Sequence, residues 1–386
     1  MRALRRELFV ILEVMRGLFL IAGLVCTVVA QDPQRLFSEA VEAQRRGDDA
    51  TAVRDYQQLL KLAPDAVEVR ANLGAALAHM GRYDEAIAQY RAALVKLPDN
   101  TGLHLNLALA YYKKSDFTSA ARELRPLQEA NPDDVRLATL LGQCYARQGR
   151  PAEAIALMGP LEPRHPDDLD LAWALGQALI QAGRLADGLP GIEKVAAARG
   201  SAEAWLLAGN AALQLDYFER AKEDADAAAR INPRLPGLYT LQGRALQSLN
   251  DNPGAIAVLR KAVAADDKDF DAQVTLGAVL NAERDVAGAR QHVERALQLR
   301  PFSSLARFEM ARIERAEGKL EAAVKDMETV ERTDPHWLQL HVELAALYYR
   351  VQRPDDGARE RAIVDRLTAE QQEKEAQPAG DRAPSR

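Results

Sequence analysis

Apolar and small residues recur along this chain with a period of about 34 residues. Within residues 67–98, VEVRANLGAALAHMGRYDEAIAQYRAALVKLP, the pair Leu73–Gly74 is followed by a break at Gly81, a small residue at Ala86 and a closing Pro98. Counterparts follow one period later at Leu107, Ala108, Ala120 and Pro132, and two periods later at Leu141, Gly142, Gly149, Ala154 and Pro166. Apolar side chains at helical spacing on both sides of a break predict two helices joined by a short turn.

This helix–turn–helix unit is predicted to occur ten times. The predicted repeats are residues 33–64, 67–98, 101–132, 135–166, 169–200, 202–233, 236–267, 270–301, 304–335 and 338–371. The fifth repeat is one residue short and ends in Gly200 where proline is expected, and Asp267 replaces the closing proline of the seventh. A solenoid of such units grows without a central core, so the length of the chain does not imply several domains.

Fixed positions of the repeat carry the residue types that close helix packing requires. Small residues at the eighth and twentieth positions, such as Gly74 and Ala86, let two helices approach closely. Glycine or a polar residue at the fifteenth position permits a left-handed turn, and proline at the thirty-second ends the second helix. The aspartates that follow Pro132 and Pro166 can cap the next helix.

With these residues the chain resembles the tetratricopeptide repeat (TPR) family over residues 33–367. The resemblance implies an all-α fold, a right-handed α-solenoid superhelix of about ten TPR helix–turn–helix units. Residues 356–367 have no following repeat to cover them and are expected to cap the array. The polar residues 372–386 are predicted to form a disordered C-terminal tail.

The N-terminal residues 17–30, GLFLIAGLVCTVVA, are uncharged and mostly apolar, and four arginines precede them. A transmembrane helix needs roughly 20 apolar residues, so this stretch is short for a membrane span. Because residues 28–30 resemble a small-residue cleavage site, we predict a signal peptide at residues 1–30 and an exported protein, periplasmic or secreted. The alternative is an uncleaved segment that holds the protein at the membrane. Glu7 and Glu13 are unusual in a signal peptide, which makes Met15 a candidate for the true start.

Composition excludes several classes of function. The net charge of −6 argues against a broadly basic nucleic-acid binder, so no nucleic-acid partner is expected. The only two cysteines, Cys26 and Cys144, allow neither a disulfide framework nor a CxxC pair. No membrane span is predicted after residue 30.

No arrangement of residues points to catalysis. The six histidines are dispersed, and the closest pair, His336 and His341, matches no known metal-ligand spacing. Phosphate-binding loops and nucleophile elbows are absent. Paired carboxylates such as Asp48–Asp49 fall at turns, where helix capping explains them better than acid–base chemistry. We therefore predict a protein that is not an enzyme and that holds no cofactor and no metal.

The resemblance implies that partners bind the concave face, which the first helix of each TPR lines with positions two, five, six, nine, twelve and thirteen. The candidate groove residues at these positions are Asn72, His79, Asn106, Tyr112, Arg136, Gln143, Trp173, Gln177, Ile180, Leu206, Asn210, Leu213 and Arg244. Asn72 and Asn106 share position six and are similar to the asparagine ladder with which some TPR superhelices grip a peptide backbone. The alternative is that they are ordinary surface residues.

The middle of the array is apolar at the same positions. Trp173, Ile180, Leu206 and Leu213, with Leu207 and Leu241, would expose apolar surface, which usually marks a binding site. The alternative is that curvature of the array buries several of them, most of all Leu207 and Leu241. We predict a protein-binding groove with Trp173 as its anchor.

Three functions remain open at this point. The first is a non-catalytic scaffold or adaptor that binds a peptide segment of a partner protein. The second is a TPR subunit of an envelope assembly or polysaccharide-export machine. The third is an accessory subunit of an envelope enzyme.

Overall fold

A computed structural model describes residues 32–376 of the chain, which divide into two compact units between Gln148 and Gly149, inside the fourth repeat. The predicted signal peptide and the residues of the predicted tail beyond 376 lie outside the described part. The first unit contains seven helices within residues 32–148: α2 (Pro33–Arg45), α3 (Asp49–Leu62), α4 (Val67–His79), α5 (Tyr83–Leu94), α6 (Thr101–Lys113), α7 (Phe117–Ala130) and α8 (Val135–Arg147).

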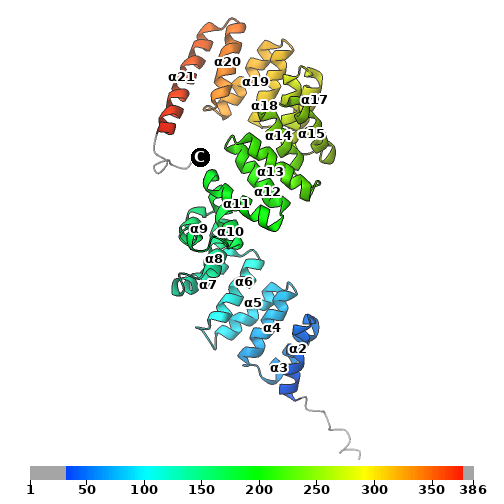
Figure 1. Ribbon diagram of the computed structural model, residues 1–386, viewed down its shortest axis with the longest axis vertical. Helices are drawn as coiled ribbons and strands as arrows, with labels where there is room; N and C mark the ends of the chain where they lie inside the picture. The colour runs from blue at the N-terminus through cyan, green and yellow to red at the C-terminus, as the bar shows by residue number, and fades with distance from the viewer. Residues whose placement is uncertain (1–31, 377–386) are drawn as a thin grey trace, which may run out of the picture. The chain divides into compact units, whose positions relative to one another are not determined.

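The second unit continues the same alternation of first and second helices (Figure 1). Its α-helices are α9 (Pro151–Met158), α10 (Leu169–Gln181), α11 (Leu185–Arg199), α12 (Ala202–Gln214), α13 (Phe218–Ile231), α14 (Leu238–Ser248), α15 (Asn252–Ala265), α16 (Phe270–Ala282), α17 (Val286–Leu299), α18 (Ser304–Ala316), α19 (Leu320–Thr333), α20 (Leu338–Arg350) and α21 (Pro354–Ala376). Every regular element in residues 32–376 is helical, so the all-α class and the solenoid of paired helices are confirmed.

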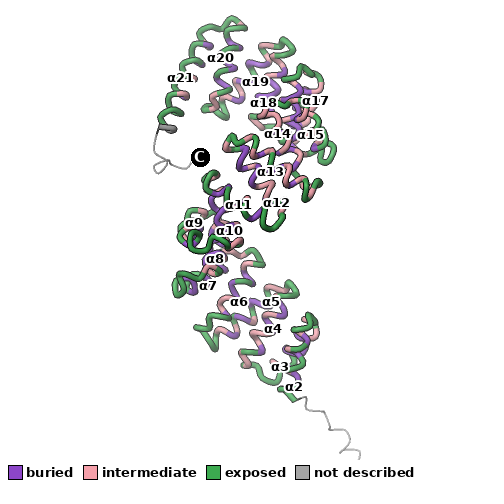
Figure 2. The backbone as a smooth tube through the Cα atoms, in the orientation of Figure 1, coloured by how far each residue is buried: buried purple, intermediate pink, exposed green. Residues whose placement is uncertain are grey.

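Each helix packs against the next one within its unit, and first helices of successive repeats also touch, as α12 does with α14 and α14 with α16. The buried positions, purple in Figure 2, are largely alanine and leucine. Gly243 shows how close the approach is, because a Cβ atom added there would lie 2.4 Å from Leu259 Cγ. Small residues at the eighth position therefore set the spacing of the two helices, as the repeat pattern predicts.

The turn between the two helices of a repeat is the same throughout residues 32–376. The fifteenth residue of every repeat has a positive φ; it is glycine in five repeats and Ser115, Asp216, Asn250, Arg284 or Gln352 in the others. The left-handed turn is thus confirmed, including where a side chain must adopt it. Asp134 and Asp168 cap α8 and α10 by accepting hydrogen bonds from backbone N–H groups at 2.9–3.1 Å, as expected after the closing prolines.

Three repeats depart from the pattern. In the fourth, α9 ends at Met158, before Pro160, and a 3₁₀ turn follows over Glu162–Arg164. In the fifth, Gly200 is left-handed (φ 61°) and ends α11 in place of a proline. In the tenth, α21 packs against α20 and continues to Ala376, past the predicted repeat end at residue 371. Most of its residues up to 373 are exposed (green in Figure 2), as a terminal cap requires.

Five repeats carry a polar contact that we call the turn clamp. The fourth residue of the repeat lies 2.7–3.4 Å from the backbone carbonyl oxygen of the residue that closes the preceding repeat. The same side chain contacts the residue nineteen positions later, on the second helix, at 2.6–3.2 Å. The clamp residues and their second-helix partners are Arg70 with Gln89, His104 with Glu123, Gln273 with His292, Arg307 with Asp326, and His341 with Glu360. The clamp fixes the turn between repeats and both helices of the repeat that follows.

The clamp at His104 is expected to make stability depend on pH. Burial lowers the pKa of His104, but the Pro98 carbonyl and Glu123 outweigh this effect and raise the pKa above 6.5. The contribution of the protonated His104 to the free energy of unfolding is therefore fully present below pH 6.5 and is lost as the pH rises through the raised pKa.

The matched variant is His104→Gln, because Gln273 makes the same carbonyl contact in the eighth repeat with a neutral amide. His104→Gln is expected to flatten the dependence of the unfolding midpoint on pH between 6 and 8. The measurement is chemical denaturation across that range, and an unchanged slope would contradict the assignment.

Asp224 occupies the second-helix position of a turn clamp, but its repeat has no polar residue at the first-helix position. It lies nineteen residues after Trp205, which occupies the fourth position of its repeat. The Asp224 carboxyl is 4% exposed, and its Oδ2 has no hydrogen-bond partner. Burial, and then the carboxylate of Glu193, raise its pKa to about 7, although Arg220 opposes the shift. The sixth repeat therefore keeps a buried acid that the helix packing does not satisfy.

Candidate functional site

Six of the thirteen predicted groove residues lie in the first unit, and two of them contact each other. Tyr112 donates a hydrogen bond from its hydroxyl to Gln143 Oε1 at 2.9 Å, which joins α6 to α8. Burial raises the pKa of Tyr112. Asn106 and Arg136 are exposed. These four residues form a polar surface on successive first helices.

The other two predicted groove residues of the first unit, Asn72 and His79, each contact a neighbouring side chain. Asn72 is half-buried beside the hydroxyl of Tyr56, with which it forms a hydrogen bond. His79 is exposed and lies 3.6 Å from an oxygen of Asp49. Of the two ladder asparagines, only Asn106 is therefore fully open to a peptide, and the predicted ladder stays a prediction.

The seven predicted residues of the second unit are less accessible than the sequence suggested. Trp173, Ile180 and Leu206 are partly buried against a core cluster that contains Ile192 and Leu241. Leu213 is itself a member of that cluster and only 7% exposed, so its assignment to the groove is corrected. The stacking of successive first helices buries it, and Leu241, at 1% exposed, is buried in the same way.

Three polar candidates remain in the second unit. Asn210 donates to the Leu206 carbonyl oxygen within its own helix, at 2.8 Å. Gln177 is half-buried and Arg244 is exposed. None of the large apolar candidates around Trp173 is among the exposed hydrophobic residues of this unit, which are Tyr217, Ile231, Phe302, Leu305, Val342 and Tyr349.

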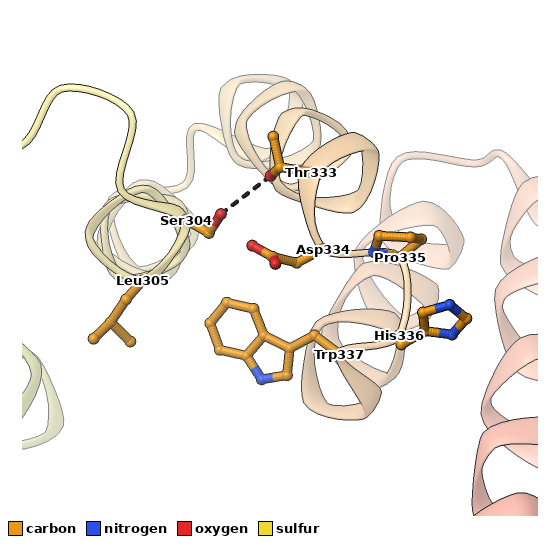
Figure 3. Close-up of a pocket in the computed structure, with 7 residues that line it drawn as sticks. All are labelled: Ser304, Leu305, Thr333, Asp334, Pro335, His336 and Trp337. Atoms are coloured by element: carbon orange, nitrogen blue, oxygen red, sulfur yellow. Dashed lines mark hydrogen bonds between the residues drawn. The ribbon is translucent and has the colours of Figure 1, made fainter. Parts of the chain in front are cut away.

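The ninth and tenth repeats contain a surface pocket of about 640 Å³, and one exposed apolar residue, Leu305, lines it. The pocket lies where the start of α18 meets the end of α19 and the turn into α20 (Figure 3). Its lining residues are Ser304, Leu305, Thr333, Asp334, Pro335, His336 and Trp337. Leu305 is 42% exposed, and Phe302, just before α18, is 95% exposed.

Packing holds the pocket walls in place. The Trp337 ring lies against the buried ring of Phe308, with centroids 4.5 Å apart. The Thr333 hydroxyl donates to the Val330 carbonyl oxygen, so the Ser304 hydroxyl donates to Thr333 Oγ1 across 3.1 Å. Asp334 directs its carboxylate between Ser304 and Trp337, as Figure 3 shows. The pocket thus combines a fixed aromatic wall, an aliphatic side chain and one carboxylate.

Charged residues on α18 and α20, the first helices of the last two repeats, form a network. Arg312 contacts Glu309 at 3.1 Å and Glu343 at 3.5 Å, and Arg315 donates to Glu343 at 2.8 Å. Burial raises the pKa of Glu309, and Arg312 opposes this shift. Glu309 and Glu343 occupy position six, where repeats two and three have asparagine, but the carboxylates of both glutamates are bound by arginines of the chain itself. They join α18 to α20 and do not offer a peptide-binding ladder.

The residues of this pocket were not among the predicted groove residues. Leu305 occupies position two, which is a groove position, but it lies outside the apolar middle of the array that the sequence favoured. Trp337 lies one residue before the tenth repeat begins and so outside the groove positions. The turn clamp could have been predicted from the sequence, because several repeats have polar residues at both position four and position twenty-three.

Two family profiles, both described as tetratricopeptide repeat, match the sequence. One matches residues 37–101, 105–158 and 240–304, and the other matches residues 202–235. A comparison with curated proteins finds no match. None of the helices described between residues 32 and 376 is long and apolar enough to cross a bilayer.

Several solved structures are similar to the chain. A chain of the APC/C hetero-tetramer Cut9–Hcn1 has a TM-score of 0.51 and 14% identity, with 88% of each chain covered. MamA from Desulfovibrio magneticus RS-1 has a TM-score of 0.38 and 22% identity, over 44% of this chain and 96% of that one. Human IFIT1, solved as a dimer with m7Gppp-AAAA, has a TM-score of 0.45 and 17% identity, over 69% and 68%. At these identities, the likeness to the Cut9–Hcn1 chain concerns the helical-repeat fold alone.

Proposed function

The chain belongs to the tetratricopeptide repeat family, and we propose that it is a non-catalytic scaffold that binds a segment of a partner protein at the pocket of its last two repeats. The repeats themselves support a protein-interaction role. The proposed location of the binding site rests on one observation, the pocket between Leu305 and Trp337. Exposed apolar surface beside a fixed aromatic wall is the usual form of a protein-binding hot spot.

The pocket also favours one kind of partner segment. An aliphatic or aromatic side chain can pack between Leu305 and Trp337. The Asp334 carboxylate, which faces the same space, suits a neighbouring lysine or arginine (Figure 3). A cation placed over the Trp337 ring would gain a further attraction. We therefore expect a segment that joins an apolar anchor to a basic residue.

This assignment replaces Trp173 as the preferred anchor. Trp173 is partly buried against the core cluster, so Trp173→Asp is expected to disturb packing as well as any binding. Leu305 is exposed, and a change there leaves the core intact.

The test is a photo-crosslinking amino acid at Leu305, with Ile231 as the matched control. Ile231 is an apolar residue of the same unit and is 46% exposed, close to the 42% of Leu305. We expect a defined crosslinked partner from position 305 and none from position 231. Leu305→Glu is expected to weaken binding of that partner at least tenfold and Ile231→Glu to leave it unchanged. Equal crosslinking at both positions would contradict the proposal.

We propose in addition that the scaffold works in the cell envelope, as a component of an assembly there. The support is the apolar stretch at residues 17–30, which resembles a signal peptide. The measurement is N-terminal sequencing of the protein isolated from its native cells. A mature terminus at Gln31 is expected, and a terminus at Met1 or Met15 would favour an uncleaved membrane-held segment instead.

A further inference from the structure

A buried histidine and two glutamates converge at the end of the array. Glu331 on α19, His341 on α20 and Glu360 on α21 place one ligand atom each within 4.8 Å of one another. His341 is 1% exposed and Glu360 is 5% exposed, whereas Glu331 is partly exposed. Three helices from two repeats therefore meet at one polar point that solvent can reach from the Glu331 side.

The repeat register identifies Glu331 as the unusual member. His341 and Glu360 form a turn clamp, which four other repeats also have, and one of these, His104 with Glu123, uses the same residue types. Glu331 stands at the twenty-eighth position of the repeat before that clamp. In the repeats that precede the other four clamps this position is aliphatic: Leu60, Leu94, Val263 and Leu297. The clamp does not require a third polar residue, so Glu331 has a separate role.

The hydrogen bonds orient His341 as a metal ligand. Its Nε2 lies 3.0 Å from the Pro335 carbonyl oxygen, which can only accept, so Nε2 carries a hydrogen. Nδ1 is the nitrogen that faces the carboxylates, 2.6 Å from Glu360 Oε2. Histidines that bind metals commonly donate their other N–H to a backbone carbonyl, which fixes the ring.

We propose that Glu331, His341 and Glu360 bind one divalent transition-metal ion, best represented by Zn²⁺. An imidazole nitrogen with two carboxylate oxygens suits zinc better than magnesium or calcium, which prefer oxygen alone. Ligand atoms in a tetrahedral zinc site lie about 3.3 Å apart, so Nδ1 and the Glu360 oxygen must separate by about 0.7 Å and the Glu331 oxygen must approach from within 4.8 Å. The ion would replace the direct contact between Nδ1 and Glu360 Oε2, and water would fill the position left open on the Glu331 side.

The site had no local signal in the sequence. Glu331 and Glu360 stand ten residues before and nineteen after His341, and only the stacking of α19, α20 and α21 brings them together. The proposal therefore departs from our expectation that the chain holds no metal. It also goes beyond the partner-binding role: the ion would join the last three helices beside the pocket, since Thr333 and Pro335 line that pocket.

The experiment is calorimetric titration of the full chain, stripped of metal with a chelator, with ZnCl₂. We expect one site and a rise in the melting temperature with zinc. In Glu331→Leu, which restores the residue type of the other clamps, the affinity is expected to fall at least tenfold while the metal-stripped protein stays as stable as the parent.

Two further variants separate this site from other histidines. His336→Ala removes the neighbouring exposed histidine, and His104→Gln alters a clamp that has no third carboxylate; both are expected to bind zinc like the parent. Unchanged affinity in Glu331→Leu, or loss of binding in His336→Ala, would overturn the proposal, as would the absence of zinc binding by the parent chain.

Discussion

At pH 8 the variant Asp224→Asn is expected to be more stable than the parent chain by about 4 kcal/mol, and this advantage is expected to disappear near pH 4. The folded state raises the pKa of Asp224 from 3.8 to about 7, chiefly through burial. The contribution of this group to stability is therefore fully present below pH 3.8 and is lost as the pH rises through about 7. Asparagine is neutral at every pH and has no such loss.

The measurement is chemical denaturation of both proteins between pH 4 and pH 8, followed by helical circular dichroism. Asp226, two residues later on α13, provides the control, because its carboxylate accepts from Lys222 and Gln242 at 2.9–3.1 Å. Asp226→Asn is expected to lose a little stability at pH 8. A gain in Asp224→Asn that is equal at pH 4 and pH 8 would refute the role given to the buried charge.

Gly243→Ala is expected to destabilise the chain by about 2 kcal/mol, although alanine favours helices. The added Cβ would lie 2.4 Å from Cγ and 2.5 Å from Cδ2 of Leu259. Because Leu259 is fully buried and Cγ is its branch point, the whole side chain or the helix must move. Overpacking of this kind costs about 1–3 kcal/mol, and the upper end exceeds the gain of about 1 kcal/mol in helix propensity.

Gly102→Ala is the matched substitution at an open helical position, where the nearest atom to the added Cβ is Asn100 Oδ1 at 3.4 Å. It is expected to be neutral or slightly stabilising. In a double-mutant cycle, Leu259→Ala should cost less in the Gly243→Ala background than in the parent. Strict additivity of the two changes would show that the steric contact is not the cause.

The helical array was predictable because every repeat solves the same packing problem with the same residue types. The left-handed residue at position fifteen appeared even where Arg284 or Gln352 occupies it, since the spacing of the helices requires the turn. Access to the surface was less predictable. Trp173 and Leu305 both occupy groove positions, yet the first packs against a core cluster and the second is exposed. The difference in their exposure depends on the side chains of the neighbouring repeats. The residue pattern of a single repeat holds no information about those side chains.

The uneven distribution of the turn clamps affects the cooperativity with which the repeats unfold. They occur in repeats two and three and in repeats eight to ten, whereas repeats four to seven have none among the contacts described. A repeat array behaves as a one-dimensional chain in which each element is coupled to its neighbours, and each clamp adds to one coupling. The couplings are thus uneven along the chain. Unfolding is expected to be most cooperative in repeats two and three and in repeats eight to ten, and repeats four to seven, whose turns lack this clamp, are the ones that can open singly.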